Sequence, residues 1–116
     1  MNLNQFTQKS VEAVQAAQQM ASARQNQQIE QEHLLYSLLT QEDSLIWKLI
    51  EKMEINQQHF KGRVENALSR RPKVSGGQAY IGQYLNKTLL GAEDEAKQMG
   101  DEYVSVEHLF LSLLDN

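Results

Sequence analysis

The stretch EHLLYSLL at residues 32–39 returns as EHLFLSLL at residues 107–114, 75 positions further along the chain. Six of the eight positions are identical, and the two that differ stay apolar in both copies. In each copy the apolar residues recur in an i, i+1, i+4, i+5 pattern, which gives a helix one continuous apolar face. Both stretches are therefore predicted to be short helices that pack into a hydrophobic core.

The same offset extends backward, without a gap, into the segments that precede the two copies. It pairs Phe6 with Ile81, Val14 with Leu89, Ala17 with Ala92, Ala21 with Ala96 and Ile29 with Val104. Any two Leu-rich amphipathic helices look somewhat alike, but a gapless register across a long and a short helix indicates a duplication. We predict that one unit, a long helix, a turn and a short helix, is used twice.

Capping and breaking residues complete the secondary-structure prediction. Ser44 and Asn56 are suited to cap two further helices, Pro72 ends the second of them, and Gly100 ends a later long helix. No segment alternates with period 2, so little or no sheet is expected. The predicted helices cover about residues 3–24, 30–40, 44–71 (two helices), 80–99 and 106–114.

The predicted fold class is all-α, a pseudo-twofold helical bundle built from two repeats. Residues 1–116 form one domain, with repeat one at about 1–71, a linker at about 72–79 and a partial repeat two at about 80–116. Two helices follow the first copy of the motif, whereas the chain stops soon after the second copy. We therefore expect repeat two to be truncated at its C-terminal side and its final helix to expose an apolar face.

Composition narrows the classes of function. The net charge is −4 and there is no Cys, so a basic nucleic-acid footprint, disulfides and thiol chemistry are not expected. No secretion signal or long apolar run is visible, which predicts a cytoplasmic domain with no membrane partner. The clustered cations Arg70, Arg71 and Lys73 are interpreted as complementing the macrodipole of the helix that ends before Pro72.

One segment has the spacing of a phosphate-binding loop. Gly77 and Gly82 are spaced as in G-x-x-x-x-G. A P-loop then requires Lys and Ser/Thr, which reach the phosphates and magnesium, but Gln83 and Tyr84 occupy those positions. The segment is interpreted as a linker followed by the start of a helix.

The histidines and two helical serines also have structural interpretations. A metal site needs three or four convergent ligands, and His33, His59 and His108 lack the HExxH spacing. His33 and His108, each preceded by Glu, are expected to bond backbone near helix starts. Ser37 and Ser112 lack the exposed turn and adjacent base that a nucleophile requires. No catalytic residue, metal ligand or cofactor is expected in this chain.

The sequence resembles a known family over essentially its whole length. Its linker RRPKVSGG, followed by IGQYL, is similar to ClpB-type disaggregases, whereas the ClpC and ClpA branches usually differ there. One departure is Glu54, where the first repeat often has Gly, so this turn is expected to be tightened differently. The strings that carry the resemblance to the double Clp N-terminal repeat are NQFTQKSVEAVQAAQ, QIEQEHLLYSLL, SLIWKLIEK, LSRRPKVSG, IGQYLNKTL and GDEYVSVEHLFLSLL.

The resemblance implies a substrate-engaging domain, monomeric by itself, that precedes the ATPase modules of a hexameric unfoldase. It would bind unfolded or aggregated polypeptide and pass it on, while ATP and magnesium would be bound elsewhere in the parent protein. Two alternatives stay open. One is an adaptor-docking N-domain of a protease-linked Clp unfoldase, and the other is a helical-bundle carrier of a metal or small molecule that uses the Glu-His pairs.

The resemblance also implies a polar site. Clp N-domains engage substrates through a Glu, matched here by Glu32 and Glu107, together with a Thr early in the long helix, matched by Thr7. In the ClpC branch such a site recognises phosphoarginine, but Gly82 replaces the Thr in repeat two, which argues against a paired site of that kind. Asp101 belongs to the acidic surface that ClpB-like domains use with aggregated substrates. Stabilisation by the helix macrodipole is a sufficient structural reason for Glu32 and Glu107.

An apolar groove is the other candidate site. Unfolded chains expose Leu, Phe and Val, which a shallow groove between helices can accept. Ordinary core packing is the alternative reading, and any binding is expected to be weak, since an unfolded segment loses entropy when it is ordered. The candidate groove residues are Phe6, Tyr80, Ile81, Tyr84 and Leu85.

Overall fold

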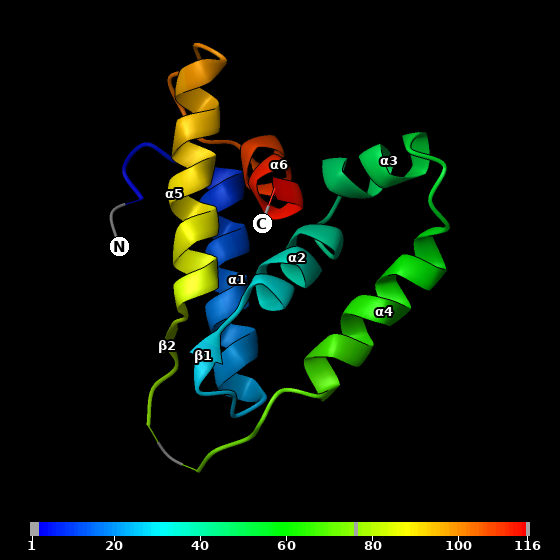
Figure 1. Ribbon diagram of the computed structural model, residues 1–116, viewed down its shortest axis with the longest axis vertical. Helices are drawn as coiled ribbons and strands as arrows, with labels where there is room; N and C mark the ends of the chain where they lie inside the picture. The colour runs from blue at the N-terminus through cyan, green and yellow to red at the C-terminus, as the bar shows by residue number, and fades with distance from the viewer. Residues whose placement is uncertain (1–2, 76, 116) are drawn as a thin grey trace.

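The computed structural model describes residues 3–75 and 77–115 and confirms the all-α prediction (Figure 1). In the described residues, six helices are joined by short connections and accompanied by two strands of two residues each. None of these helices has the length and apolar character needed to cross a membrane. The elements are α1 (Gln8–Ala23), β1 (Gln28–Ile29), α2 (Gln31–Leu39), α3 (Leu45–Lys52), α4 (Gln57–Ser69), β2 (Tyr80–Ile81), α5 (Gln83–Gln98) and α6 (Val106–Asp115).

Several predicted helix boundaries are confirmed by the capping geometry. The Ser44 hydroxyl accepts the backbone N–H of the third residue after it, at 3.1 Å, at the start of α3. Asn56 does the same for α4, at 2.9 Å. Gly100 follows α5 with φ 73°, a left-handed conformation that costs glycine no steric strain. Glu54 adopts φ 60°, so this turn uses the backbone conformation that Gly would favour, at a cost of about 1 kcal/mol.

The two long helices begin later than predicted, because the residues before them are extended. β2 pairs in parallel with β1, in the register Gln28 with Tyr80 and Ile29 with Ile81. An isolated parallel bridge joins Phe6 to Val104, the positions equivalent to Ile81 and Ile29. The segment that enters each long helix therefore pairs with the segment that enters the short helix of the other repeat. Helical periodicity gives no signal for strands this short.

The core forms where α1 meets α2. Ala13, Ala17 and Ala21 lie along one side of α1 and are completely buried. Because these side chains are small, α2 approaches closely and buries Leu34 and Leu38 completely. Each of these leucines stabilises the fold by about 1.5–3 kcal/mol through removal of apolar surface from water.

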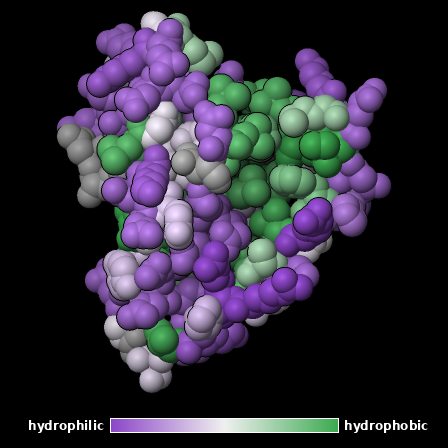
Figure 2. All heavy atoms as spheres, in the orientation of Figure 1, coloured by the Kyte–Doolittle hydropathy of each residue, from purple (hydrophilic) through white to green (hydrophobic). Residues whose placement is uncertain are grey.

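The remaining helices leave an apolar hollow open on one side. α3 and α4 reach away from the other helices, with α3 contacting α6 and α4 contacting α2 (Figure 1). Figure 2 shows the hydrophobic residues gathered in this hollow. Leu114 of α6 is 56% exposed, whereas its repeat equivalent Leu39 is 6% exposed. Leu109 and Phe110 of the same helix are 0% and 4% exposed, so the apolar exposure expected for the final helix is present at Leu114 but does not extend along the whole face.

Candidate functional site

His33 fixes the start of α2 from inside the core. Its ring is completely buried, and its Nδ1 accepts the backbone N–H of Glu30 at 2.8 Å. Because Nδ1 accepts, the ring proton lies on Nε2, which donates to Asn26 Oδ1 at 2.9 Å. Burial is the main cause that lowers the pKa of His33 below 6.5; nearby Glu32 opposes the shift, and Arg71 reinforces it. His33 is thus a neutral structural residue.

His108 repeats this arrangement at the start of α6. Its Nδ1 accepts the N–H of Ser105 at 2.9 Å, and its Nε2 lies 2.8 Å from Asp101 Oδ2. The Asp101 side chain is 48% exposed, in contrast with the buried Asn26 at the equivalent position. The prediction that these two histidines bond backbone at helix starts is confirmed. Within residues 3–75 and 77–115 there is no group of three or more His, Cys, Asp or Glu residues that could hold a metal ion.

Thr7 lies beside the segment that enters α6. Its Oγ1 accepts the Ser10 N–H at 3.3 Å and so caps α1. Its own N–H donates to the Val104 carbonyl at 2.9 Å, and the Ser10 hydroxyl donates to the same carbonyl at 2.8 Å. The structure therefore joins Thr7 to the second repeat, the repeat that carries Glu107, whereas Glu32 lies at the start of α2 in the first repeat.

Asp101, Glu107 and Tyr103 line one surface hollow of about 400 Å³ near the start of α6. Glu107 is exposed, and Tyr103 is 49% exposed. We call the surface formed by Thr7, Asp101, Tyr103, Val104 and Glu107 the α1–α6 junction.

The pseudo-symmetric surface is formed at the start of α5. The N–H of Gly82 donates to the Ile29 carbonyl at 3.1 Å, as that of Thr7 donates to Val104. A Cβ on Gly82 would lie 2.8 Å from the side-chain oxygens of both Gln28 and Glu30. A Thr at position 82 would have to displace both side chains, which is a physical reason for the Gly at this point.

Glu32 is held by a cation of its own chain. Arg71 Nε donates to Glu32 Oε2 at 2.6 Å, and Nη2 also contacts this oxygen. Arg71 Nη1 lies 3.4 Å from Glu30 Oε2. Arg71 thus binds the two carboxylates at the start of α2. The sequence predicted only that Arg71 complements the macrodipole of the helix before Pro72, and did not indicate this ion pair. We call the surface formed by Glu30, Glu32, Arg71, Tyr80 and Gly82 the α2–α5 junction.

The five residues of the candidate apolar groove do not share one surface environment. Phe6 and Leu85 are 6% and 1% exposed and belong to the core, and Ile81 is half-buried against it. Tyr80 and Tyr84 are 50% and 56% exposed. Of these five residues, only the two tyrosines offer a large area to a partner.

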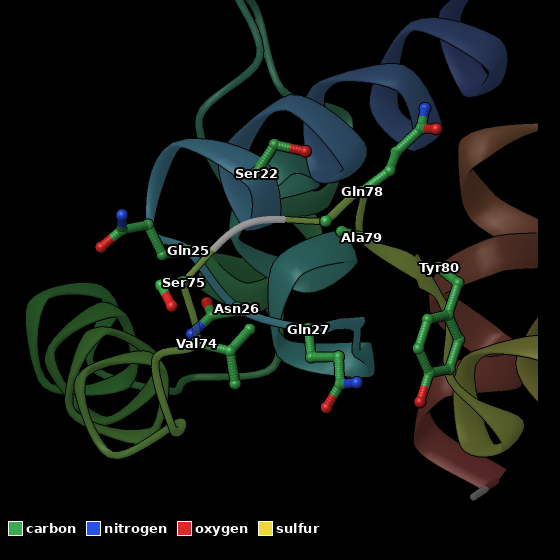
Figure 3. A pocket seen from close by; sticks show the side chains of 10 residues that line it. Ser22, Gln25, Asn26, Gln27, Val74, Ser75, Gln78, Ala79 and Tyr80 are labelled. Carbon is green, nitrogen blue, oxygen red and sulfur yellow. The ribbon is translucent and has the colours of Figure 1, made fainter.

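A further hollow of about 490 Å³ lies between the end of α1 and the linker (Figure 3). Asn26 anchors the linker there, because its Nδ2 donates to the Pro72 carbonyl at 3.2 Å. The Val74 N–H donates to the Gln25 carbonyl at 2.9 Å, and Figure 3 shows Val74 beside Asn26. No local sequence pattern indicates this contact, since the partners are 46 residues apart.

Two repeats of a long and a short helix, whose entering segments pair across the repeats, define a class of two-repeat helical domain. The sequence profile of the Clp repeat (R) N-terminal domain family matches residues 5–116. The chain belongs to this family.

Individual relatives agree with this assignment. The chain is 39% identical over 120 residues to the chaperone protein ClpB of Nitratidesulfovibrio vulgaris, an alignment that covers 99% of this chain and 14% of that protein. The chain thus spans a small part of the length of this relative.

Solved structures share the fold. The Hsp104 N-terminal domain from Candida albicans superimposes with a TM-score of 0.87 at 21% identity, covering 96% of this chain and 74% of that one. A ClpV N-domain in complex with a VipB peptide has a TM-score of 0.81 at 16% identity, covering 100% of this chain and 74% of that one.

Proposed function

We propose that this chain is the substrate-engaging N-domain of a ClpB-type disaggregase. In this role it binds unfolded or aggregated polypeptide and passes it to ATPase modules, which lie outside this chain and bind ATP and magnesium. Membership of the Clp repeat family and 39% identity to a ClpB chaperone support the proposal.

The observation that carries the proposal is the state of Glu107 at the α1–α6 junction. Glu107 is exposed, and among the described residues no cation forms an ion pair with it. It lines the same hollow as Asp101 and the exposed ring of Tyr103. A tyrosine beside the unpaired carboxylate of Glu107 offers both apolar contact and attraction for basic groups, which suits polypeptide segments of mixed sequence. Affinity should be modest, because an unfolded segment loses entropy on binding.

The test is binding of fluorescently labelled casein, a natively unfolded polypeptide, followed by anisotropy. The double variant Glu107→Gln/Tyr103→Ser should weaken binding about tenfold, since aromatic anchors dominate most interfaces. The matched control is Glu51→Gln/Met53→Ser at the end of α3, which removes one charge and one exposed large side chain elsewhere. Equal binding by both double variants would refute the assignment to this junction.

Docking of a defined adaptor segment is the second candidate function. Its support is that a domain of the same fold has been solved with a peptide bound, the ClpV N-domain with a VipB peptide. A chain that docks adaptors should select one sequence from a peptide array and bind casein poorly. A chain that engages aggregates should bind casein and many unrelated apolar peptides with similar affinity.

A further inference from the structure

The two junctions are built alike, yet one is open and the other is occupied. Each has an extended pair of segments and a Glu in the first turn of a short helix. Each also has an exposed tyrosine, but on opposite segments, since Gln28 occupies the position equivalent to Tyr103. Tyr80 and Tyr103 are exposed to nearly the same extent, 50% and 49%. The carboxylates differ, because Glu107 has no ion-pair partner in the described part of the chain whereas Glu32 is bound by Arg71.

We propose that Arg71 is an internal competitor that holds the α2–α5 junction closed, so that this junction becomes a second substrate-engaging surface only when Arg71 leaves. The inference rests on the proposed function, since it treats Glu32 as a group able to contact substrate. It adds regulation to that function. One of two equivalent surfaces is available at all times, and the other is available only after an ion pair has opened.

The geometry of Arg71 is that of a ligand in a site. Its guanidinium reaches two carboxylates, with Nε 2.6 Å from Glu32 Oε2 and Nη1 3.4 Å from Glu30 Oε2. The carboxylate side chains are well covered, 22% exposed for Glu32 and 12% for Glu30. A planar guanidinium satisfies such a pair better than a point charge does. While Arg71 is in place, its guanidinium occupies Glu32 Oε2 and lies against Glu30 Oε2, the oxygens that a cationic group of a substrate would otherwise contact at this junction.

The contact is nevertheless suited to opening. The Arg71 side chain is 37% exposed, so water and salt screen the ion pair. Arg71 follows the C-terminal end of α4, at the point where the chain turns into the linker. The linker is attached to the turn after α1 by the Asn26–Pro72 and Gln25–Val74 hydrogen bonds. Because these bonds hold the linker backbone in place, the guanidinium can be released by a change of the Arg71 side chain alone, with no change in the core.

The size of the effect follows from the exchange between closed and open states. A partly exposed ion pair of this kind favours the closed state by a factor of about five, and the apparent affinity of this junction for substrate is reduced by about the same factor. Removal of the Arg71 guanidinium should therefore tighten binding at this junction about fivefold.

The experiment measures casein binding by the chain and by two arginine variants. Arg71→Ala removes the internal competitor. Arg70→Ala is the matched control, because it removes the same charge one residue earlier from an exposed side chain that contacts neither Glu30 nor Glu32. Because the α1–α6 junction stays available in both proteins, a fivefold gain at one of two equal surfaces should raise the total casein affinity of Arg71→Ala about twofold. Arg70→Ala should bind as the unchanged chain does. Adding Glu32→Gln to Arg71→Ala should abolish the gain.

The other outcomes of the casein experiment distinguish the internal competitor from the proposed function. If Arg71→Ala and Arg70→Ala change binding equally, the effect is one of net charge and the internal competitor is refuted. The same holds if the gain survives Glu32→Gln. If the unchanged chain binds casein and Arg71→Ala binds it equally well, the inference fails and the proposed function stands. If neither of these two proteins binds casein, both fail. Binding by Arg71→Ala alone supports the internal competitor and refutes the assignment of an open substrate-engaging surface to the α1–α6 junction.

Discussion

Exchanging the residues that face the two histidines should affect the two repeats very differently. Asn26 Oδ1 accepts a hydrogen bond from His33 Nε2–H, and Asn26 Nδ2 donates to the Pro72 carbonyl. In Asn26→Asp the first contact survives, but a carboxylate oxygen then faces the carbonyl across 3.2 Å. Asn26 is 5% exposed, so water cannot separate the two acceptors.

The cost of Asn26→Asp can be worked from these contacts. Loss of the hydrogen bond to Pro72 costs about 1 kcal/mol, and burial of an unsatisfied acceptor costs about 1–2 kcal/mol more. The reciprocal change, Asp101→Asn, keeps the acceptor for His108 Nε2 on a side chain that is 48% exposed. Only the charge assistance of that bond is lost, at about 0.5–1 kcal/mol. The free energy of unfolding should therefore fall by about 2–3 kcal/mol for Asn26→Asp and by clearly less for Asp101→Asn.

The assay is urea unfolding near neutral pH, followed by far-ultraviolet circular dichroism and by the fluorescence of the single tryptophan, Trp47. On acidification the deficit of Asn26→Asp should shrink relative to the unchanged chain, because a protonated carboxyl donates to the Pro72 carbonyl as the amide does. Equal losses for the two variants, or a stable Asn26→Asp, would refute the assigned hydrogen-bond directions and the linker anchor.

Three further predictions concern stability. Gln25 has φ 60°, and its repeat equivalent Gly100 has φ 73°. Gln25→Gly should therefore raise the free energy of unfolding in urea by about 0.5–1 kcal/mol. A lower free energy of unfolding would show that contacts of the Gln side chain outweigh the backbone strain. Since burial lowers the pKa of His33, the unfolded chain binds a proton between that lowered pKa and 6.5 that the folded chain does not. The free energy of unfolding should therefore fall as the pH is lowered through 6.5. His33→Gln keeps an acceptor and a donor but cannot titrate, so it should flatten the curve of unfolding free energy against pH. An unchanged slope of that curve would assign the loss to other groups. Ala17→Leu should lower the thermal midpoint by the equivalent of about 1–3 kcal/mol, because Ala17 is fully buried where α1 meets α2; a variant as stable as the unchanged chain would mean that α2 can move away at little cost.

The features that sequence predicts well here depend on neighbouring residues or on repetition. Ser44 and Asn56 cap their helices through bonds that span three residues, so local pattern is sufficient to find them. The duplication was visible because EHLLYSLL and EHLFLSLL share a register. The family resemblance, which rests on the same strings, is likewise confirmed by the match over residues 5–116.

The features that sequence did not predict depend on partners that are distant along the chain. Arg71 and Glu32 are 39 residues apart, and no local pattern indicates that they form an ion pair. Tyr80 and Ile81 continue the apolar period of α5, yet their backbone pairs with β1 instead. The resemblance implies the polar candidate residues one by one, and only the fold shows that Thr7 adjoins the second repeat.

The exchange of strands between the repeats also constrains how the protein is made. A chain that emerges from the ribosome has its first repeat outside long before the second is complete. Yet the Ser10 hydroxyl and the Thr7 amide donate to the carbonyl of Val104, which for Ser10 is 94 positions away. Until that residue emerges, the Thr7 amide can donate only to water, while the Ser10 hydroxyl retains the nearby Thr7 carbonyl, 2.8 Å away, as an acceptor. The nascent first repeat is therefore expected to remain frayed at its beginning and to close only when the last helices are delivered.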